Sequence, residues 1–286
     1  MVENKRKTVA LVIGSGGAKP FGLIPFFKML EDHQLKPDAI FGCSGGCLLG
    51  SLWAAGYPIA GLEDFLNIST DFLKDKKIYS SIDYRTILSM GNYPGGKFEL
   101  SSGMVHTLSA FERVKDFVHG RQIEDSIIKT TIFATDLETG QQVALDKGSL
   151  AEAMYASCAV YPMFNPLKVN NRWLVDGAYY SALPIIPAIQ QGYDKIIAIS
   201  FEDKEPENYG SFFEFYLQFI AQVLTKNSRK QNSMAIDLHH DEILFLNVKF
   251  DRCVRVWEIG NFDYLNSVTQ QMLDRSQEDI IAMFNQ

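Results

Sequence analysis

A serine flanked by glycines is the residue of this sequence best suited to nucleophilic chemistry. Ser44 lies in the segment 42–46, Gly-Cys-Ser-Gly-Gly, which has the spacing Gly-x-Ser-x-Gly. We predict that the apolar run 38–41 before it is a buried strand and that 48–55 after it is a helix. At a strand-to-helix turn this spacing forces the serine into a strained, outward-pointing conformation, beside glycines that avoid collisions with backbone. Taken alone, the spacing also fits a glycine-rich turn with an ordinary hydroxyl.

A second glycine-rich segment could supply hydrogen-bond donors to an anion. The β-branched and aliphatic run 8–13 predicts a strand buried on both faces, and Gly-Ser-Gly-Gly-Ala-Lys-Pro follows at 14–20, before a helix. A nucleotide-phosphate loop does not fit, because Gly-x-x-x-x-Gly-Lys-Ser/Thr is absent and Lys19 holds the last position of Gly-x-Gly-x-x-Gly. An oxyanion hole needs the same free N–H groups, so the segment is a candidate for one.

A single aspartate follows a predicted hairpin. The runs 167–169 and 172–175 are expected to pair around Asn170-Asn171, and Asp176-Gly177 comes next. Asp-Gly is ordinary turn chemistry, so Asp176 alone predicts a turn residue rather than a base.

The composition indicates a globular α/β protein. The chain has 286 residues, 47% of them hydrophobic, and a net charge of −7 without a basic cluster, which argues against nucleic-acid binding. Its four cysteines have no Cys-x-x-Cys spacing, so free thiols are expected. No signal peptide or membrane span is recognisable, and we therefore expect a cytoplasmic protein.

The remaining elements are predicted from periodicity and capping. We expect helices over 61–77, 104–118, 184–191 and 265–284, and strands over 129–134, 142–145, 195–200 and 242–248. Ser149 is expected to cap a further helix that runs to Ser157, with Glu152 as its capping-box partner. The strand 195–200 is expected to be the last core strand, and the polar stretch 202–210 to mark a boundary. This predicts a core over 1–205 and a helix–strand–helix extension over 206–286, packed on it within one structural domain.

The segment 211–225 predicts a helix that is apolar over most of its circumference. Phe212, Phe215 and Phe219 form one row along it. Burial statistics favour a core helix. The alternative is an apolar cap beside an active site that handles acyl chains.

With these segments in hand, the chain resembles the patatin-like phospholipases, acyl hydrolases related to the cytosolic phospholipase A2 fold. The resemblance is carried by Gly14–Lys19, Gly42–Gly46 and Asp176-Gly177-Ala178, which occur in the family's order. Similar supporting stretches occur at 134–140, 148–153 and 156–160. The resemblance covers roughly residues 8 to 200. It implies a three-layer α/β/α fold with a central, mostly parallel sheet.

The resemblance also implies an activity and its residues. Ser44 would attack a fatty-acyl ester of a phospholipid, a lysophospholipid or a related lipid, and Asp176 would take the Ser44 proton without a histidine. Backbone N–H groups of Gly16, Gly17 and Ala18 would form the oxyanion hole. The implied chemistry needs no cofactor and no metal; the implied partner is lipid, with a membrane surface as a candidate setting, and the oligomeric state is not implied.

Pro20 departs from the family, which usually has glycine there. Proline has no N–H, so the donors must come from the residues before it, and Lys19 is expected to be pushed toward extended dihedrals. One alternative is therefore a patatin-like scaffold that binds lipid or a partner without turnover. Another is an α/β-hydrolase triad using His239 or His240, although their polar surroundings favour a solvated surface.

Overall fold

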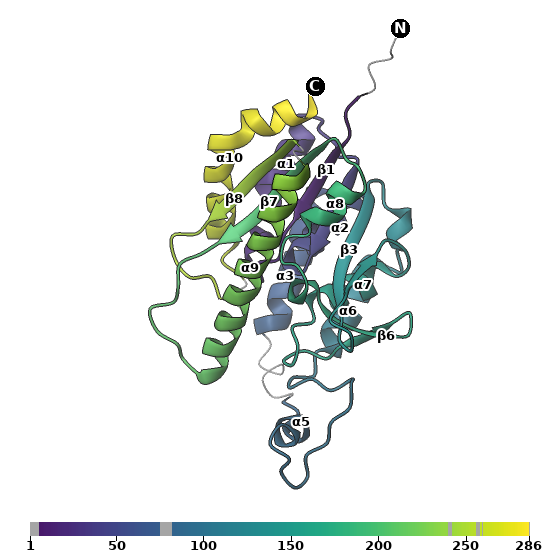
Figure 1. The fold of residues 1–286 in the computed structure, drawn as a ribbon, viewed down its shortest axis with the longest axis vertical. Coiled ribbons are helices and arrows are strands. Elements are labelled where there is room, and N and C mark those ends of the chain that lie inside the picture. Colours follow the sequence, from purple (N-terminus) through teal and green to yellow (C-terminus); the bar gives the residue numbers. More distant parts are fainter. Residues whose placement is uncertain (1–5, 75–81, 240–241, 256–257, 259, 286) are drawn as a thin grey trace.

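The fold is built on one mixed sheet with helices on both faces (Figure 1). A computed structural model describes residues 6–74, 82–239, 242–255, 258 and 260–285. The strands are β1 (Val9–Ile13), β2 (Ala39–Cys43), β3 (Lys129–Asp136), β4 (Gln142–Leu145), β5 (Leu167–Val169), β6 (Arg172–Asp176), β7 (Lys195–Glu202) and β8 (Glu242–Lys249). Their order is β5-β6-β3-β2-β1-β7-β8, and β4 pairs with β3.

Parallel pairing dominates the centre of the sheet. β3, β2, β1, β7 and β8 run parallel to one another, whereas β4, β5 and β6 join in antiparallel pairs. Ile13 pairs with both Gly42 and Ile199. This register brings the carboxyl ends of β1, β2 and β7 to the same edge of the sheet, where ligands of parallel sheets usually bind.

Both faces of the central strands are buried, as predicted for the run 8–13. Leu11 and Ile13 pack into one apolar cluster and Ala10 and Val12 into another on the opposite face. The helices are α1 (Ile24–Asp32), α2 (Gly45–Ala54), α3 (Ile59–Lys74), α5 (Tyr84–Ser89), α6 (Leu108–Val118), α7 (Leu150–Cys158), α8 (Ile185–Gln190), α9 (Phe212–His239) and α10 (Phe262–Phe284), with short 3₁₀ helices at Lys19–Leu23, Ile123–Asp125 and Gly177–Tyr179. Helices α1, α2, α3, α7 and α10 contribute to the first cluster and α8 to the second, so the predicted three-layer α/β/α fold with its mostly parallel sheet is confirmed.

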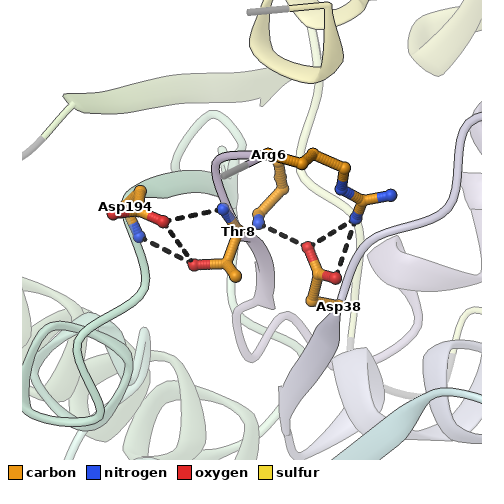
Figure 2. Close-up of polar contacts among 5 residues, drawn as sticks. Arg6, Thr8, Asp38 and Asp194 are labelled. Carbon is orange, nitrogen blue, oxygen red and sulfur yellow. Dashed lines mark hydrogen bonds and ion pairs between the residues drawn. The ribbon is translucent and has the colours of Figure 1, made fainter. Parts of the chain in front are cut away.

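Hydrogen bonds and an ion pair connect the amino ends of β1, β2 and β7 (Figure 2). Arg6 binds both carboxylate oxygens of Asp38 at 2.8 Å, and Asp38 also accepts a hydrogen bond from the Val9 amide. On the other side, Thr8 donates to Asp194 through its amide and its hydroxyl. Asp38 precedes β2 and Asp194 precedes β7, so these contacts help to fix the register that aligns the carboxyl ends.

The prediction that 195–200 is the last core strand is wrong. β8 pairs with β7 along all eight residues of each strand, Lys195 to Glu202 with Glu242 to Lys249, and α9 is the crossover between them. The apolar run in 242–248 predicted the strand, but no local feature of the sequence indicated which edge of the sheet it would join. The division at residue 205 stays a prediction; the residues after it supply one edge of the same sheet.

Two local predictions also need correction. Helix α6 begins at Leu108 rather than at 104, because the amides of Met104 and Val105 donate instead to the carbonyl groups of Pro162 and Met163. Lys19 is not extended but opens a 3₁₀ helix, in which its amide donates to Gly16 O. The predicted helix 61–77 is present as α3, whose last expected residues, 75–77, lie outside the described residues.

Within the described part of the chain, none of the helices combines the length and the apolar character that a membrane span requires.

Candidate active site

Ser44 occupies a sharp turn between β2 and α2, as predicted. It is the N-cap of α2 and has φ 52° and ψ −136°, a conformation that side chains rarely adopt and that costs about 1–3 kcal/mol. The turn is possible only because glycines surround it. A Cβ on Gly45 would lie 2.1 Å from Gly17 O, and one on Gly46 would lie 2.2 Å from Gly14 O. The same glycines therefore shape the elbow and let the 14–18 loop pack against it.

A buried serine holds the elbow from the other side. The Ser44 amide donates to Ser157 Oγ at 2.8 Å, and Ser157 Oγ donates to the carbonyl of Phe133 at 2.6 Å. Ser157 is the penultimate residue of α7 and Phe133 belongs to β3, so one hydroxyl joins three elements beneath Ser44. Because its amide is already paired, Ser44 does not offer this N–H to a substrate.

Asp176 ends β6 and faces Ser44. The hairpin before it turns through Asn170 and Asn171, both with positive φ, as the sequence predicted. Ser44 Oγ donates to Asp176 Oδ2 at 2.6 Å, and the Ala178 amide donates to Oδ1 at 2.8 Å. The structure thus brings together the two side chains singled out from positions 132 residues apart.

Glycine after the aspartate is a steric requirement. A Cβ on Gly177 would lie 2.2 Å from Phe133 O and 3.0 Å from Cys43 Sγ. The Asp176 turn therefore packs directly on β3 and β2, and this close approach lets the carboxylate reach the residue that follows β2.

Burial sets the electrostatics of the pair. Ser44 is 7% exposed and Asp176 only 4%. Removal from water raises the pKa of Asp176 to about 6, against the opposing effect of hydrogen bonds from Ser44 and the Ala178 amide. A carboxylate with this pKa is largely ionised at neutral pH and a stronger base than a surface aspartate.

Thiols surround the pair without carrying charge. Burial raises the pKa of Cys43, whose S–H donates to Ser181 O at 3.4 Å. A hydrogen bond with Cys47, together with burial, raises the pKa of Cys158. Cys43 and Cys158 therefore stay protonated at neutral pH, and the group that the Asp176 carboxylate faces is the Ser44 hydroxyl.

The loop between β1 and the first 3₁₀ helix presents unpaired amides beside the elbow. Gly14 N and Ser15 N donate to the carbonyl groups of Ile199 and Ala182, which anchors the start of the loop. Across the described residues, the amides of Gly16, Gly17 and Ala18 donate to no protein acceptor. Three free N–H groups at the carboxyl end of a central strand are the parts that an anion site needs.

Two contacts fix the end of this loop. Lys19 Nζ lies 3.0 Å from Asp203 Oδ1 in a largely buried ion pair, and Asp203 follows β7. Pro20 is the second residue of the 3₁₀ helix, in the first turn, where a backbone N–H would have no partner within the helix. Its ring packs beside Gly45. Pro20 thus fits the loop, and Lys19 ties it to the sheet.

Some residues of the site were not predicted. Ser157 lies in a stretch that carries the resemblance, but its bond to the Ser44 amide has no local signature. Asp203 lies in a polar run that indicated only a boundary. The alternative triad would need His239 or His240. His240 lies outside the described residues. The backbone of α9 ends at His239, next to the amino end of β8, and Ser44 lies at the opposite edge of the sheet.

Several known proteins are similar to this chain. An uncharacterized NTE family protein of Mycobacterium tuberculosis is 30% identical over 197 residues, 69% of this chain and 50% of that protein. A lysophospholipase NTE1 of Candida albicans is 27% identical over 210 residues, 71% of this chain and 14% of that protein. The chain therefore spans half or less of the length of these curated relatives.

Two solved structures also match. VipD from Legionella pneumophila has 13% identity and a TM-score of 0.46, with 95% of this chain and 67% of that chain covered. The type III effector protein ExoU has 14% identity and a TM-score of 0.43, with 96% and 53% covered.

The family assignment comes from the sequence match. Residues 11–189 match the family described as patatin-like phospholipase. This range is more than half of the 286 residues and contains both glycine-rich segments and Asp176. The chain therefore belongs to the patatin-like phospholipase family.

Proposed function

We propose that this chain is a serine acyl hydrolase that cleaves fatty-acyl esters of phospholipids or lysophospholipids, met at a membrane surface. The observation that carries the proposal is the 2.6 Å hydrogen bond from Ser44 Oγ to Asp176 Oδ2 in a buried site. The family and a lysophospholipase among the relatives support a lipid substrate.

The first half-reaction forms an acyl-enzyme. Asp176 Oδ2 takes the hydroxyl proton while Ser44 Oγ attacks the ester carbonyl, which gives a tetrahedral oxyanion. The oxyanion collapses, the bond to the alcohol breaks, and the alcohol oxygen takes the proton back from Asp176. The acyl group is left on Ser44 Oγ. The alcohol that departs is a lysophospholipid when the substrate is a phospholipid, and a glycerophosphodiester when it is a lysophospholipid.

The second half-reaction returns the free enzyme. Asp176 takes a proton from a water molecule that attacks the acyl-serine, and a second tetrahedral oxyanion forms. When this collapses, Ser44 Oγ leaves and recovers the proton, and the fatty acid is released. Because the pKa of Asp176 is raised to about 6, this carboxylate can both accept and return a proton near neutral pH.

The free amides of Gly16, Gly17 and Ala18 are the proposed oxyanion donors. The positive end of α2, at Ser44, adds to the same field. Each well-placed donor stabilises such a transition state by about 3–4 kcal/mol.

An active-site label tests the nucleophile. A fluorophosphonate probe should react covalently with Ser44, identified by peptide mass spectrometry, because the probe traps an activated serine. Ser44→Ala should lose the label. Ser51→Ala is the matched control, since Ser51 is a buried serine of α2 and its hydroxyl, among the described residues, donates to Leu48 O in its own helix. Absence of labelling in well-folded protein contradicts the hydrolase and favours a binding scaffold.

A further inference from the structure

Large apolar side chains are exposed in two clusters. The 84–98 cluster consists of Tyr84, Met90, Tyr93 and Phe98, each more than half exposed. The 209–219 cluster consists of Tyr209, Phe212, Phe215 and Phe219, of which Phe212 is 82% exposed. Scattered exposed apolar residues need no explanation, but rows of aromatic rings on adjacent turns do.

The 209–219 cluster corrects the sequence-based preference for a core helix. Helix α9 buries Leu217, Ser228 and Asn232 against the fold, whereas the row of phenylalanines faces outward. Tyr209 packs edge-on against Phe215, with ring centroids 5.2 Å apart, and Phe215 stacks on Phe219 at 6.3 Å. The exposed rings therefore hold one another in place and form an ordered surface.

Both clusters lie at the edge of the sheet that carries the candidate active site. α9 begins after the carboxyl end of β7 and runs back to the amino end of β8, so its first turns lie at the carboxyl edge. Figure 1 shows α5 and the beginning of α9 at the lower end of the molecule, toward which β1 and β7 run. Ser44 follows the carboxyl end of β2 and faces the same end.

A hydrogen bond at Tyr161 connects the cavity of the 84–98 cluster to the Asp176 turn. A cavity of about 450 Å³ within this cluster is lined by Met90, Tyr93 and Phe98 together with Tyr161. The Tyr179 hydroxyl donates to the carbonyl of Tyr161, and Tyr179 belongs to the 3₁₀ helix that directly follows Asp176.

The 209–219 cluster is connected to the same turn through α9. The Leu183 amide donates to Ser228 Oγ at 3.1 Å, and Asn232 Nδ2 donates to Leu183 O at 3.0 Å. Leu183 follows the Asp176 turn by a few residues. Both clusters therefore belong to segments that are joined to the chain around the Asp176 turn.

The charges of these segments identify the surface that they fit. Residues 82–108 contain two acidic and two basic residues, and residues 203–230 contain four of each, so both segments are formally neutral. The whole chain carries a net charge of −7 and is repelled by an anionic surface. Tyrosine and phenylalanine rings without net charge suit the boundary between headgroups and acyl chains of a zwitterionic lipid layer.

We propose that the 84–98 and 209–219 clusters form one docking face that holds the Ser44 site against a zwitterionic lipid surface. The inference rests on the proposed function for its choice of a lipid occupant. Docking is driven by insertion of aromatic rings on both sides of the site and needs no basic residues, so it is insensitive to salt.

The test measures partition onto vesicles separately from catalysis. Ser44→Ala protein is mixed with phosphatidylcholine vesicles and sedimented, so that binding is recorded without hydrolysis. In this background, Phe212→Ser/Phe215→Ser/Phe219→Ser and Tyr93→Ser/Phe98→Ser should each lower the partition coefficient at least about tenfold. Ile127→Ser is the matched control, because Ile127 is 66% exposed but lies just before the amino end of β3. Its partition should equal that of the parent.

Catalysis on a dissolved substrate separates docking from the proposed activity. With Ser44 intact, the same cluster variants should hydrolyse a short-chain, water-soluble ester at the parent rate and lose activity only on vesicles. Unchanged partition of both cluster variants overturns the docking face, whether or not the chain is a hydrolase. So does binding that requires anionic vesicles and disappears in high salt. A parent dimer that the variants convert to monomer, without vesicle binding, assigns the face to a second copy instead.

Discussion

The Asp176 carboxylate differs from a surface aspartate in its surroundings rather than in its chemistry. It is buried, and within the described residues its hydrogen-bond donors are the Ser44 hydroxyl and the Ala178 amide. Burial makes the charged form costly and raises its pKa to about 6. In the proposed mechanism, this shift makes the Asp176 carboxylate basic enough to take the Ser44 proton without an intervening histidine.

The shifted pKa predicts how activity depends on pH. We expect kcat/KM for an ester substrate to rise with pH through a single ionisation near 6, because only the ionised carboxylate can accept the Ser44 proton. Initial rates with a soluble ester across the pH range, far below KM, give this profile. A flat profile through that region contradicts the assignment of Asp176 as the base.

Ser157 is a positioning residue whose loss should act through Ser44. Ser157→Ala leaves the Ser44 amide without its acceptor and removes the hydrogen bond to the Phe133 carbonyl, and the unpaired amide costs about 1–3 kcal/mol of stability. A displaced elbow should also lower kcat about 10–100-fold, while KM changes little. Full kinetics and thermal denaturation measure both effects. Ser51→Ala should change neither by much, and a Ser157→Ala protein with normal kcat refutes the positioning role.

At the scale of elements, the site depends on close approach between glycine backbones. The 14–18 loop, the Ser44 elbow and the Asp176 turn meet where Gly45, Gly46 and Gly177 leave no room for a Cβ. Local signals were enough to predict the elbow, the Asn170-Asn171 hairpin and the Ser149 cap of α7, whose Oγ accepts from the Glu152 amide. The bond between Ser157 and Ser44 could not be predicted, because it depends on how α7 packs against β2.

The close approach at Gly45 can be tested directly. Gly45→Ala places a methyl group 2.1 Å from Gly17 O and should push the 14–18 loop away, with activity reduced at least about 100-fold. Gly61→Ala is the control, because a Cβ at Gly61 would lie no closer than 3.4 Å to other atoms, which is ordinary contact. Alanine also stabilises a helix such as α3 by about 1 kcal/mol relative to glycine. The hydrolysis rates and melting temperatures of the two variants are measured and compared with those of the parent protein. An active Gly45→Ala enzyme contradicts the packing of loop on elbow.

At the scale of the whole molecule, the candidate active site and the proposed docking face lie at the same edge of the sheet, the carboxyl edge of its parallel strands. The apolar run 8–13 predicted a strand buried on both faces, as β1 is, whereas the mostly parallel sheet was implied by the resemblance to the family. The place of β8 beside β7 and the outward face of α9 could not be predicted. An apolar helix carries the same pattern whether protein or lipid covers it, and only the assembled fold shows that Phe212, Phe215 and Phe219 face outward.

Hydrolysis by Asp176→Asn protein is the most direct test of the account. At pH 8, a soluble acyl ester should be turned over at least about 1,000-fold more slowly by the variant than by the parent, since the amide cannot accept the Ser44 proton. The melting temperature should not fall. The pKa of Asp176 in the folded protein lies above the ordinary 3.8, so its protonated form stabilises the fold below about pH 4. That stabilisation is lost as the pH rises through about 6, and the asparagine removes the buried charge that opposes folding at pH 8. A folded Asp176→Asn protein that keeps a tenth or more of the parent rate contradicts the Ser44–Asp176 mechanism.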